Sequence, residues 1–519
     1  MIARAPRRRA PFLLLVPAGM AAVIAVMPIV YLLDRAGSLG WERAWRELYQ
    51  DRTFDLLVRS VTLATVVAVL ASVIGVVAAW LLFRSDLPGR RVWQVLMVLP
   101  LAVPSYAAAY AWISWRPSMA PFPGSVLALT LVSYPFVFLP VAAALRRLDP
   151  AHEEVARSLG YGAARTAFAL TLRQIRPAIA AGALLVALYV LSDFGAVATF
   201  RYEVFTFVVY GAYNAGFDPT LAAVLALALV AVAAILVLVE SWIRGSAAFA
   251  RIGAGTARTA APVRLGAGRV PAWLFLGTVF GLGIVFPMWR FVYWTRRALE
   301  TAIPMDEVLT ALRHSLWLSF LAAVATVLLA IPVGVLIARY RSRTTAVIER
   351  STYVAHALPG VVVAIALVYV GVRLLRPIYQ EVPLLVLAYV VLFLPLAIGT
   401  VRAAVEQSEV RQEEVAQSLG KRPLLVLTRI TLPRAAPAIA GGAALVFVTT
   451  MKELPATLLL HPTGMDTLAT KLWSFTAETN YAAGAPYVMG IVLFSAIPTA
   501  LLTWLVVDRD PRSDGVVVG

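Results

Sequence analysis

The chain has 519 residues, of which 61% are hydrophobic and 14% are charged, and its mean hydropathy is +0.82. An average soluble domain carries about 25% charged residues, so a soluble protein of this composition would not cover its surface. The formal charge of +17 would suit a nucleic-acid partner, but the topology described below accounts for it. The absence of cysteine excludes disulfides, iron–sulfur clusters and thiolate metal sites.

The apolar residues cluster into segments long enough to cross a bilayer as helices, which takes about 20 residues. The first segment follows four arginines and has no convincing small-residue cleavage site after it, so we interpret it as an uncleaved first helix. The twelve predicted spans are 11–33, 57–83, 92–114, 125–145, 177–198, 219–243, 272–293, 314–338, 351–372, 383–401, 437–460 and 485–507.

The basic residues alternate between the two sides of these spans. With the N-terminus inside, the cytoplasmic segments hold about two thirds of the 45 Lys and Arg, which is the positive-inside pattern. This distribution accounts for the formal charge without a nucleic acid. We therefore expect a multi-pass protein of the bacterial inner membrane with both termini in the cytoplasm.

The chain contains an internal repeat. The sequence EEVARSLG at 153–160 recurs as EEVAQSLG at 413–420, and FLP at 138–140 recurs at 393–395. Each half holds six spans, an even number, so both halves share one orientation and should be related by an axis along the membrane normal. The expected fold class is an all-α polytopic membrane protein with about twelve transmembrane helices in two parallel six-helix halves.

This organisation predicts six segments. Two are permease-like transmembrane domains, and the others are the first helix of each half with its periplasmic loop, a cytoplasmic linker rich in Arg, Gly and Ala, and a cytoplasmic tail. In chain order they are 1–56, 57–243, 244–271, 272–313, 314–507 and 508–519.

The repeated loop lies between the fourth and fifth spans of each half, on the cytoplasmic side. A surface helix with Glu153 paired to Arg157 would explain the first copy, but Gln417 replaces that arginine in the second copy. Residues 161–170 match 421–430 at no position, although the flanking blocks match well. A helix that keeps its first turns and its terminal Gly across the repeat is typical of docking to another protein. The docking residues expected are Glu153, Glu154, Ala156, Gly160, Glu413, Glu414, Ala416 and Gly420.

These loops, each followed by a span that begins at a proline, resemble the EAA loop of type I ABC importer permeases. The resemblance covers nearly the whole chain in two copies. It implies that each loop is a coupling helix for a cytoplasmic ATPase, so the partners expected are two ATPase copies, a periplasmic binding protein and membrane lipid. The chain has no G-x-x-x-x-G-K-[ST] loop; we therefore expect it to bind no cofactor and to be no enzyme, with ATP and Mg²⁺ used by the partner.

Further segments resemble the fused permeases for ferric iron, including LSDFGAVATFRYEVFTFVVY at 191–210 and TTMKELPATLLLHPTGMDTLATKLW at 449–473. So do LPLAVPSY at 99–106 and HALPGVVV at 356–363. The resemblance implies import of ferric iron. The alternative cargoes are thiamine, whose fused permease has the same two-copy plan, and other small solutes. A secondary transporter would explain twelve spans but not two docking loops.

Two acids stand at equivalent depths in the fifth span of each half. Asp193 and Glu453 both follow a proline, Pro177 or Pro437, by 16 residues, which is about 24 Å along a helix. Acids at such depth usually face a cavity or a partner, and hard cations favour carboxylate oxygens. They are equally able to pair with Lys452 or to cap a broken helix before Gly195 and Pro455. The candidate pathway or gate residues are Ser192, Asp193, Lys452 and Glu453; no metal ligand is firmly assigned, and no catalytic set is found.

Overall fold

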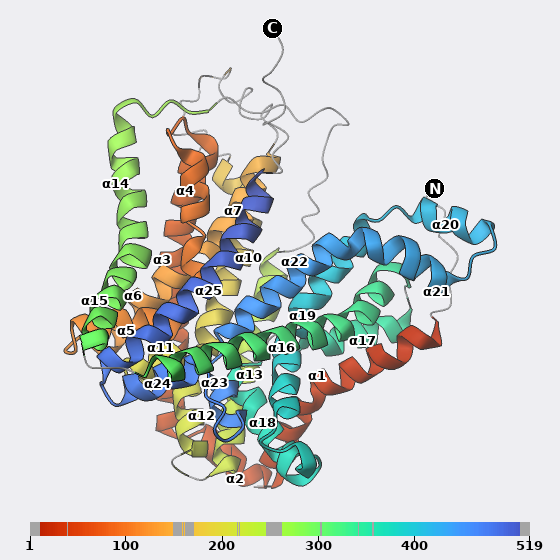
Figure 1. Cartoon of the computed structure of the whole chain (residues 1–519), viewed down its shortest axis with the longest axis horizontal. Coiled ribbons are helices and arrows are strands. Elements are labelled where there is room, and N and C mark those ends of the chain that lie inside the picture. Colours follow the sequence, from red (N-terminus) through yellow and green to blue (C-terminus); the bar gives the residue numbers. More distant parts are fainter. Residues whose placement is uncertain are drawn as a thin grey trace. The chain divides into compact units, whose positions relative to one another are not determined.

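The computed structural model describes residues 11–38, 40–148, 158, 160, 171–214, 216, 218–244, 262–300, 304–340, 342–354 and 358–508. Throughout these ranges the chain is built from helices joined by short loops (Figure 1). The helices of the first half are α1 (Phe12–Ser38), α2 (Trp41–Leu48), α3 (Asp51–Arg84), α4 (Arg90–Leu96), the 3-10 turn η1 (Leu99–Ala102), α5 (Ser105–Trp115), α6 (Pro121–Ser133), α7 (Pro135–Arg147), α10 (Leu172–Ser192), α11 (Gly195–Thr199), α12 (Phe205–Asn214) and α13 (Pro219–Arg244).

The second half has a comparable series of helices. Its helices are η3 (Gly266–Gly268), α14 (Arg269–Phe280), the π-helical segment η4 (Gly281–Val285), α15 (Phe286–Glu300), α16 (Met305–Arg339), α17 (Arg343–Val354), α18 (Gly360–Arg373), η6 (Arg376–Ile378), α19 (Val382–Gln407), α20 (Val410–Ser418), α21 (Pro423–Val426), the π-helical segment η7 (Leu427–Thr431), α22 (Leu432–Met451), α23 (Pro455–Leu460), α24 (Leu468–Ala477) and α25 (Tyr481–Asp508).

Ten helices among the described residues are long and apolar enough to cross a membrane. They correspond to ten of the twelve predicted spans. The third span of each half, predicted at 92–114 and 351–372, is not one continuous helix. In the first half, the segments Arg90–Ala102 and Ser105–Trp115 meet at an angle of 87°. In the second half, α17 ends at Val354 and the apolar helix α18 begins only at Gly360.

Prolines account for both interruptions. Pro104 is the N-cap of α5 and Pro359 is the N-cap of α18, each with an extended backbone. A proline lacks the amide hydrogen that a continuous helix would use, and it pushes the preceding residue out of the helical region. The two prolines are therefore suited to begin a new helix and not to continue an old one.

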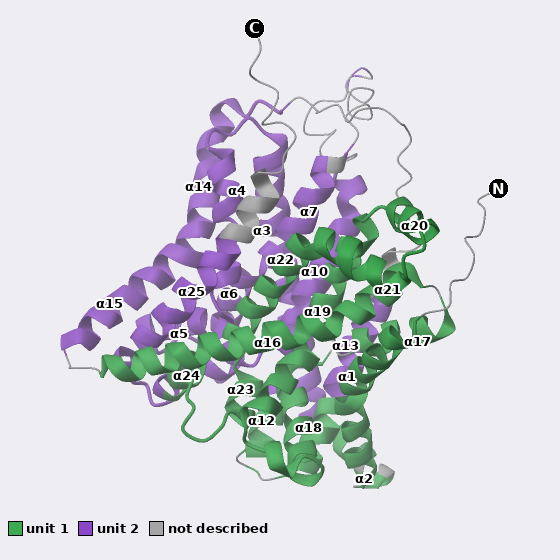
Figure 2. Ribbon diagram, turned by 45° about the vertical axis from the view of Figure 1, so that its right-hand side comes forward, with its two compact units in different colours: residues 1–48, 209–227, 304–474 green, residues 49–208, 228–303, 475–519 purple. Residues whose placement is uncertain are grey.

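The described residues fall into two compact units, coloured separately in Figure 2. Unit 1 comprises residues 1–48, 209–227 and 304–474, and unit 2 comprises residues 49–208, 228–303 and 475–519. Each unit contains three helices that pack against one another: α16, α19 and α22 in unit 1, and α3, α7 and α10 in unit 2. These two triplets come from equivalent places in the repeat.

Each unit takes its outermost helix from the other half of the sequence. In unit 1, α1 packs against α16, α17 and α18; in unit 2, α15 packs against α5 and α25. Small residues allow the triplet helices to approach closely. A Cβ added to Gly182 of α10 would lie 2.7 Å from the Cα of Val137 on α7. The equivalent Gly442 of α22 lies in the same way against Thr400 of α19.

The end of the linker is bound to the C-terminal end of α3. Val263 N donates to Arg84 O at 2.8 Å, and Asp86 N donates to Val263 O at 3.1 Å. The Asp86 carboxylate accepts hydrogen bonds from Arg269 Nη2 at 2.5 Å and from Leu265 N at 2.9 Å. The Arg269 hydrogen bond, followed by that of Leu265, holds the pKa of Asp86 below its usual range. Of the predicted linker 244–271, residues 245–261 lie outside the described ranges.

Candidate functional site

The second copy of the repeated loop lies within the described residues, whereas most of the first copy does not. Glu153, Glu154 and Ala156 fall outside the described ranges, and Gly160 is described with a φ of +83°. Glu413, Glu414, Ala416 and Gly420 are all described, and the first three lie on α20. The predicted short helix is therefore observed in the second copy.

Helix α20 ends in a Schellman motif around Gly420, whose φ is +79°. Gly420 N donates to Gln417 O at 3.0 Å, and Lys421 N donates to Ala416 O at 3.1 Å. These two bonds use carbonyls that the last helical turn would otherwise leave unpaired. The left-handed conformation favours Gly, and Gly160 has the same conformation at the equivalent position. The structure thus supplies the reason for both glycines.

The faces of α20 differ in exposure. Glu413 and Ala416 are buried, at 7% and 8% exposed, and stand one helical turn apart. On the other side, Val415 is 60% exposed and Leu419 is 74% exposed, and Glu414 is also exposed. An exposed apolar pair beside a carboxylate, on a helix held from behind, is a surface suited to protein docking.

Glu413 is bound to a residue that sequence reasoning missed. Its Oε1 atom accepts hydrogen bonds from Arg339 Nη2 at 2.9 Å, from Arg339 Nε at 3.1 Å and from Thr431 Oγ1 at 2.9 Å. Arg339 is the last residue of α16. One feature of the sequence could have identified Arg339: an arginine, Arg84, also ends α3, the equivalent helix of the first half.

The candidate pathway residues lie where the fifth spans are interrupted. Helix α10 ends at Ser192, and Asp193 caps the short helix α11: its Oδ1 atom accepts hydrogen bonds from Ala196 N at 2.9 Å and Val197 N at 3.4 Å. The Ser105 hydroxyl, at the start of α5, also hydrogen-bonds to this carboxylate. Asp193 is 7% exposed.

The second half has the same arrangement with other residues. Helix α22 ends at Met451, and Lys452 is its C-cap. The Glu453 carboxylate accepts hydrogen bonds from Ala456 N at 2.9 Å, from Thr457 N at 2.9 Å and from Thr457 Oγ1 at 2.8 Å. It caps the short helix α23. In both halves the observed geometry is that of a capped helix break, which is one of the interpretations that the sequence left open.

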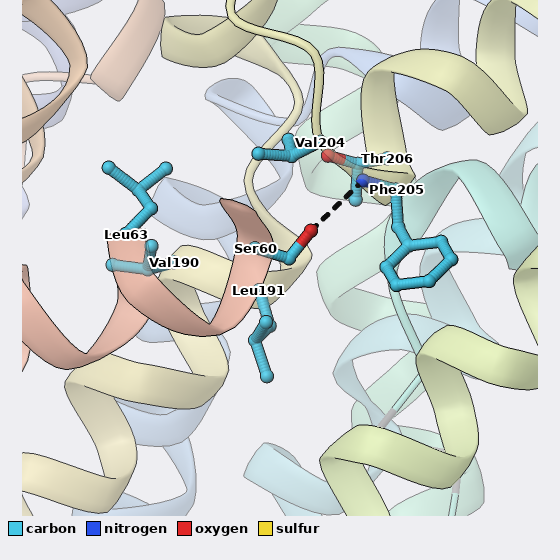
Figure 3. Close-up of a pocket in the computed structure, with 7 residues that line it drawn as sticks. All are labelled: Ser60, Leu63, Val190, Leu191, Val204, Phe205 and Thr206. Carbon is cyan, nitrogen blue, oxygen red and sulfur yellow. Dashed lines mark hydrogen bonds between the residues drawn. The ribbon is translucent and has the colours of Figure 1, made fainter. Parts of the chain in front are cut away.

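In each unit the interrupted fifth span packs against the interrupted third span: α11 against α5, and α23 against α18. A serine of the second span then fixes the following helix. Ser60 Oγ accepts a hydrogen bond from Phe205 N at 3.2 Å, which begins α12 (Figure 3). Ser315 Oγ accepts one from Leu468 N at 2.9 Å, which begins α24. The side chains around Ser60 are mostly apolar and include Leu63, Val190 and Leu191.

The described residues contain no group of three His, Asp or Glu side chains placed to hold a metal ion. The carboxylates of Asp193 and Glu453 are occupied by backbone amides and hydroxyls, as described above. The arrangement that the described residues do form is a pair of capped helix breaks in equivalent places.

Long apolar helices, two equivalent halves and a short helix with an exposed apolar pair are the features expected of a polytopic membrane transport component. Residues 71–246 and 330–512 each match the family described as "Binding-protein-dependent transport system inner membrane component". The chain therefore belongs to this family, with the family domain present twice. It is the transmembrane permease subunit of an ATP-driven importer in the inner membrane, and ATP hydrolysis is carried out by a separate subunit.

Individual relatives support this assignment. The chain is 36% identical over 498 residues to the Fe(3+)-transport system permease protein FbpB 2 of Haemophilus influenzae. The aligned region covers 95% of this chain and 98% of the relative. It is 27% identical over 190 residues to the sulfate transport system permease protein CysT of Escherichia coli, covering 34% of this chain and 69% of the relative. The spermidine/putrescine permease PotC of Escherichia coli is 27% identical over 196 residues, 37% of this chain and 74% of its own length.

Proposed function

We propose that this permease imports ferric iron, delivered by a periplasmic binding protein. The supporting observation is the 36% identity to an Fe(3+)-transport permease over 95% of the chain, where the sulfate and polyamine permeases match about a third of it. The segments around both capped breaks also resemble ferric iron permeases in sequence.

Uptake by the reconstituted complex tests the cargo. The permease is placed in proteoliposomes with its ATPase inside and its binding protein outside, and radioactive ferric iron is offered beside thiamine and sulfate. ATP-dependent accumulation of iron alone supports the proposal. Accumulation of thiamine or sulfate in preference to iron contradicts it, and accumulation without ATP would indicate a secondary transporter.

We propose that two ATPase copies dock on this chain, one at each cytoplasmic loop. Ala416 packs inward beside Glu413, while Glu414, Val415 and Leu419 offer a docking face; the sequence repeat gives the first loop the same residue types at Glu153, Glu154, Ala156 and Gly160. The chain itself carries no cofactor, and ATP and Mg²⁺ belong to the partner. The mass of the purified complex gives the copy number, and ATPase activity in the isolated permease would contradict the assignment.

We propose that both termini, the linker and both loops face the cytoplasm. The support is the concentration of Lys and Arg in alternate loops. Because the chain has no cysteine, single cysteines are clean probes. A cysteine introduced at Gly255 or Ala261 should react with an impermeant maleimide only after the membrane is permeabilised; labelling in intact cells would overturn this orientation.

We propose that Ser192, Asp193, Lys452 and Glu453 contribute to the outer part of the pathway or its gate. Interrupted helices at equivalent positions of two repeats commonly line transport sites, and an ionisable group at membrane depth indicates function. The double variant Asp193→Asn, Glu453→Gln keeps an oxygen for each cap but removes both charges. We expect lower iron uptake with unchanged thermal stability and unchanged ATPase association. Normal uptake would show that the acids serve as caps alone.

A further inference from the structure

We infer that Arg339 is a positioning residue that transmits movement of the docking helix α20 to the membrane helices of its unit. It does so through a buried cluster with Glu413 and Thr431, termed here the loop latch. The inference rests on the proposed coupling function and assigns its internal mechanism. It also separates the two adjacent glutamates of the motif: Glu413 faces the latch, and Glu414 faces the docking partner.

One guanidinium joins three segments. Arg339 ends α16, and its Nη2 atom donates to Val405 O at 2.7 Å and Ser408 O at 3.0 Å, at the C-terminal end of α19. Its Nη2 and Nε atoms also bind Glu413 on α20, at 2.9 Å and 3.1 Å. A cation beside the last carbonyls of a helix is favoured by the helix dipole. Arg339 therefore fixes α20 to the ends of two triplet helices.

The third helix of the triplet is joined through Thr431. Its hydroxyl donates to Glu413 Oε1 at 2.9 Å, and Thr431 is the last residue of η7, directly before α22. A single carboxylate oxygen thus accepts three charge-assisted hydrogen bonds, two of them from a cationic donor. The Arg339 and Glu413 side chains are only 13% and 9% exposed, so solvent screens this pair less than a surface ion pair.

The latch explains which way α20 faces. Residues 413 and 416 point inward at one-turn spacing, while Glu414, Val415 and Leu419 are exposed. A force applied to the exposed face cannot rotate α20 alone, because Glu413 holds it to α16, α19 and α22. The helices that pack together in unit 1 would move with the loop.

The first half holds the same latch residues at equivalent positions. Arg84 ends α3 as Arg339 ends α16, and Thr171 precedes α10 as Thr431 precedes α22. Both are buried, at 9% and 3% exposed. The repeat in the sequence places Glu153 at the position of Glu413, outside the described ranges. An arginine and a threonine kept in both halves, outside the loop motif itself, point to a shared role.

The test measures coupling separately from docking. Arg339→Ala, Glu413→Ala and their double variant are assembled with the partner ATPase in proteoliposomes, with Glu414→Gln as the matched control on the exposed face. We expect the latch variants to bind the ATPase within about twofold of the unaltered complex, while uptake per ATP hydrolysed falls at least about fivefold. The double variant should be no worse than either single one, because the residues act as a unit. Glu414→Gln should weaken ATPase binding instead.

Conservative variants keep the test decisive if an alanine variant does not fold. Arg339→Lys retains the charge, but a single ammonium cannot reach the carboxylate and both carbonyls as the planar guanidinium does. We expect Arg339→Lys to show intermediate uptake per ATP with normal ATPase binding. Normal uptake per ATP in Arg339→Lys and Glu413→Gln would overturn the latch, as would a Glu413→Gln variant that loses ATPase binding as Glu414→Gln does. Failure of the unaltered complex to transport with ATP would instead overturn the proposed function.

Discussion

In the first half of the chain the acid at the helix break is Asp193, and the Ser105 hydroxyl hydrogen-bonds to it. In the second half the acid is Glu453, and Gly360 stands where Ser105 stands, at the first residue of the equivalent helix. A Cβ added to Gly360 would lie 2.8 Å from Glu453 Oε1 and 3.0 Å from Pro455 Cγ. The longer acid is therefore matched with the residue that has no side chain.

This difference shows that each helix break depends on two residues, the acid and the first residue of the helix beside it. Aspartate, one methylene shorter, leaves room for a serine side chain and gains a hydroxyl partner. Glutamate fills that room itself and takes its hydroxyl partner, Thr457, from the helix that it caps. Both solutions satisfy the first amides of a short helix. Neither position can be interpreted without its partner.

The largest effect is expected when the space beside Glu453 is filled. Gly360→Val places a branched side chain where its Cβ alone would come 2.8 Å from Glu453 Oε1. Overpacking of this kind costs about 1–3 kcal/mol, and displacement of the cap adds to it. We expect uptake to fall about tenfold or more with a lower melting temperature, measured by ATP-driven uptake and by thermal unfolding in detergent.

The matched control lies in the other half. Ser105 already has a Cβ, so Ser105→Ala removes only the hydroxyl and leaves Asp193 its amide partners. We expect its uptake and melting temperature to stay close to those of the unaltered protein. A Ser105→Ala variant as impaired as Gly360→Val would show that space is not what distinguishes the halves.

The second effect compares the two copies of the repeated loop. Gly160 and Gly420 have φ values of +83° and +79°, a conformation that costs an L-residue about 1–2 kcal/mol. Gly160→Val and Gly420→Val should each lower uptake per ATP by about fivefold or more, because we propose that each loop docks one ATPase copy. The measurement is uptake per ATP hydrolysed, with membrane insertion followed by blotting. Normal coupling in the Gly160→Val, Gly420→Val double variant would contradict the docking role of both loops.

The sequence was sufficient for the features that repeat or that extend over many residues. Ten spans, the two halves and the short helix ending at Gly420 follow from apolar length, internal repetition and the conformational preference of glycine. The interruption of the third spans did not follow, although Pro104 and Pro359 stand inside them. A proline inside an apolar run is compatible with a kinked span or with a new helix, and only packing decides between them.

The loop latch could not be predicted from the sequence, for a different reason. Arg339 and Glu413 are 74 residues apart in the chain, and no local pattern joins them. The capping of Asp193 and Glu453 was weighed as one of two interpretations, because a buried acid near a Gly or Pro has both uses. The local sequence identified candidate functional residues, but the tertiary contacts were needed to assign a role to each of them.

The third effect concerns the caps themselves. Asp193→Ala and Glu453→Ala each leave two backbone amides without the carboxylate that accepts them. Asp193 and Glu453 stand one residue before the N-caps Phe194 and Leu454 but accept hydrogen bonds from the same amides as an N-cap side chain. Loss of such an acceptor costs about 0.5–2 kcal/mol, so each variant should melt at a lower temperature than the unaltered protein. Asp193→Asn and Glu453→Gln retain an acceptor oxygen and should melt close to it. Equal destabilisation by the amide and alanine variants would indicate that charge, and not capping, holds the break.

The smallest effect is expected when the first half's pair is transferred to the second half. Gly360→Ser alone should be impaired, because its Cβ meets Glu453 Oε1. Adding Glu453→Asp shortens the acid and recreates the combination of Ser105 with Asp193. We expect the double variant to recover uptake to within about twofold of the unaltered protein, since coupled neighbours depart from additivity. The uptake of Glu453→Asp alone should fall between that of Gly360→Ser and that of the double variant, because the shortened acid withdraws from Gly360 without gaining a serine hydroxyl. The cycle is measured by uptake and by melting temperature on the same four proteins. Additive losses in the double variant would mean that the two positions act independently and that the match between acid length and neighbour is incidental.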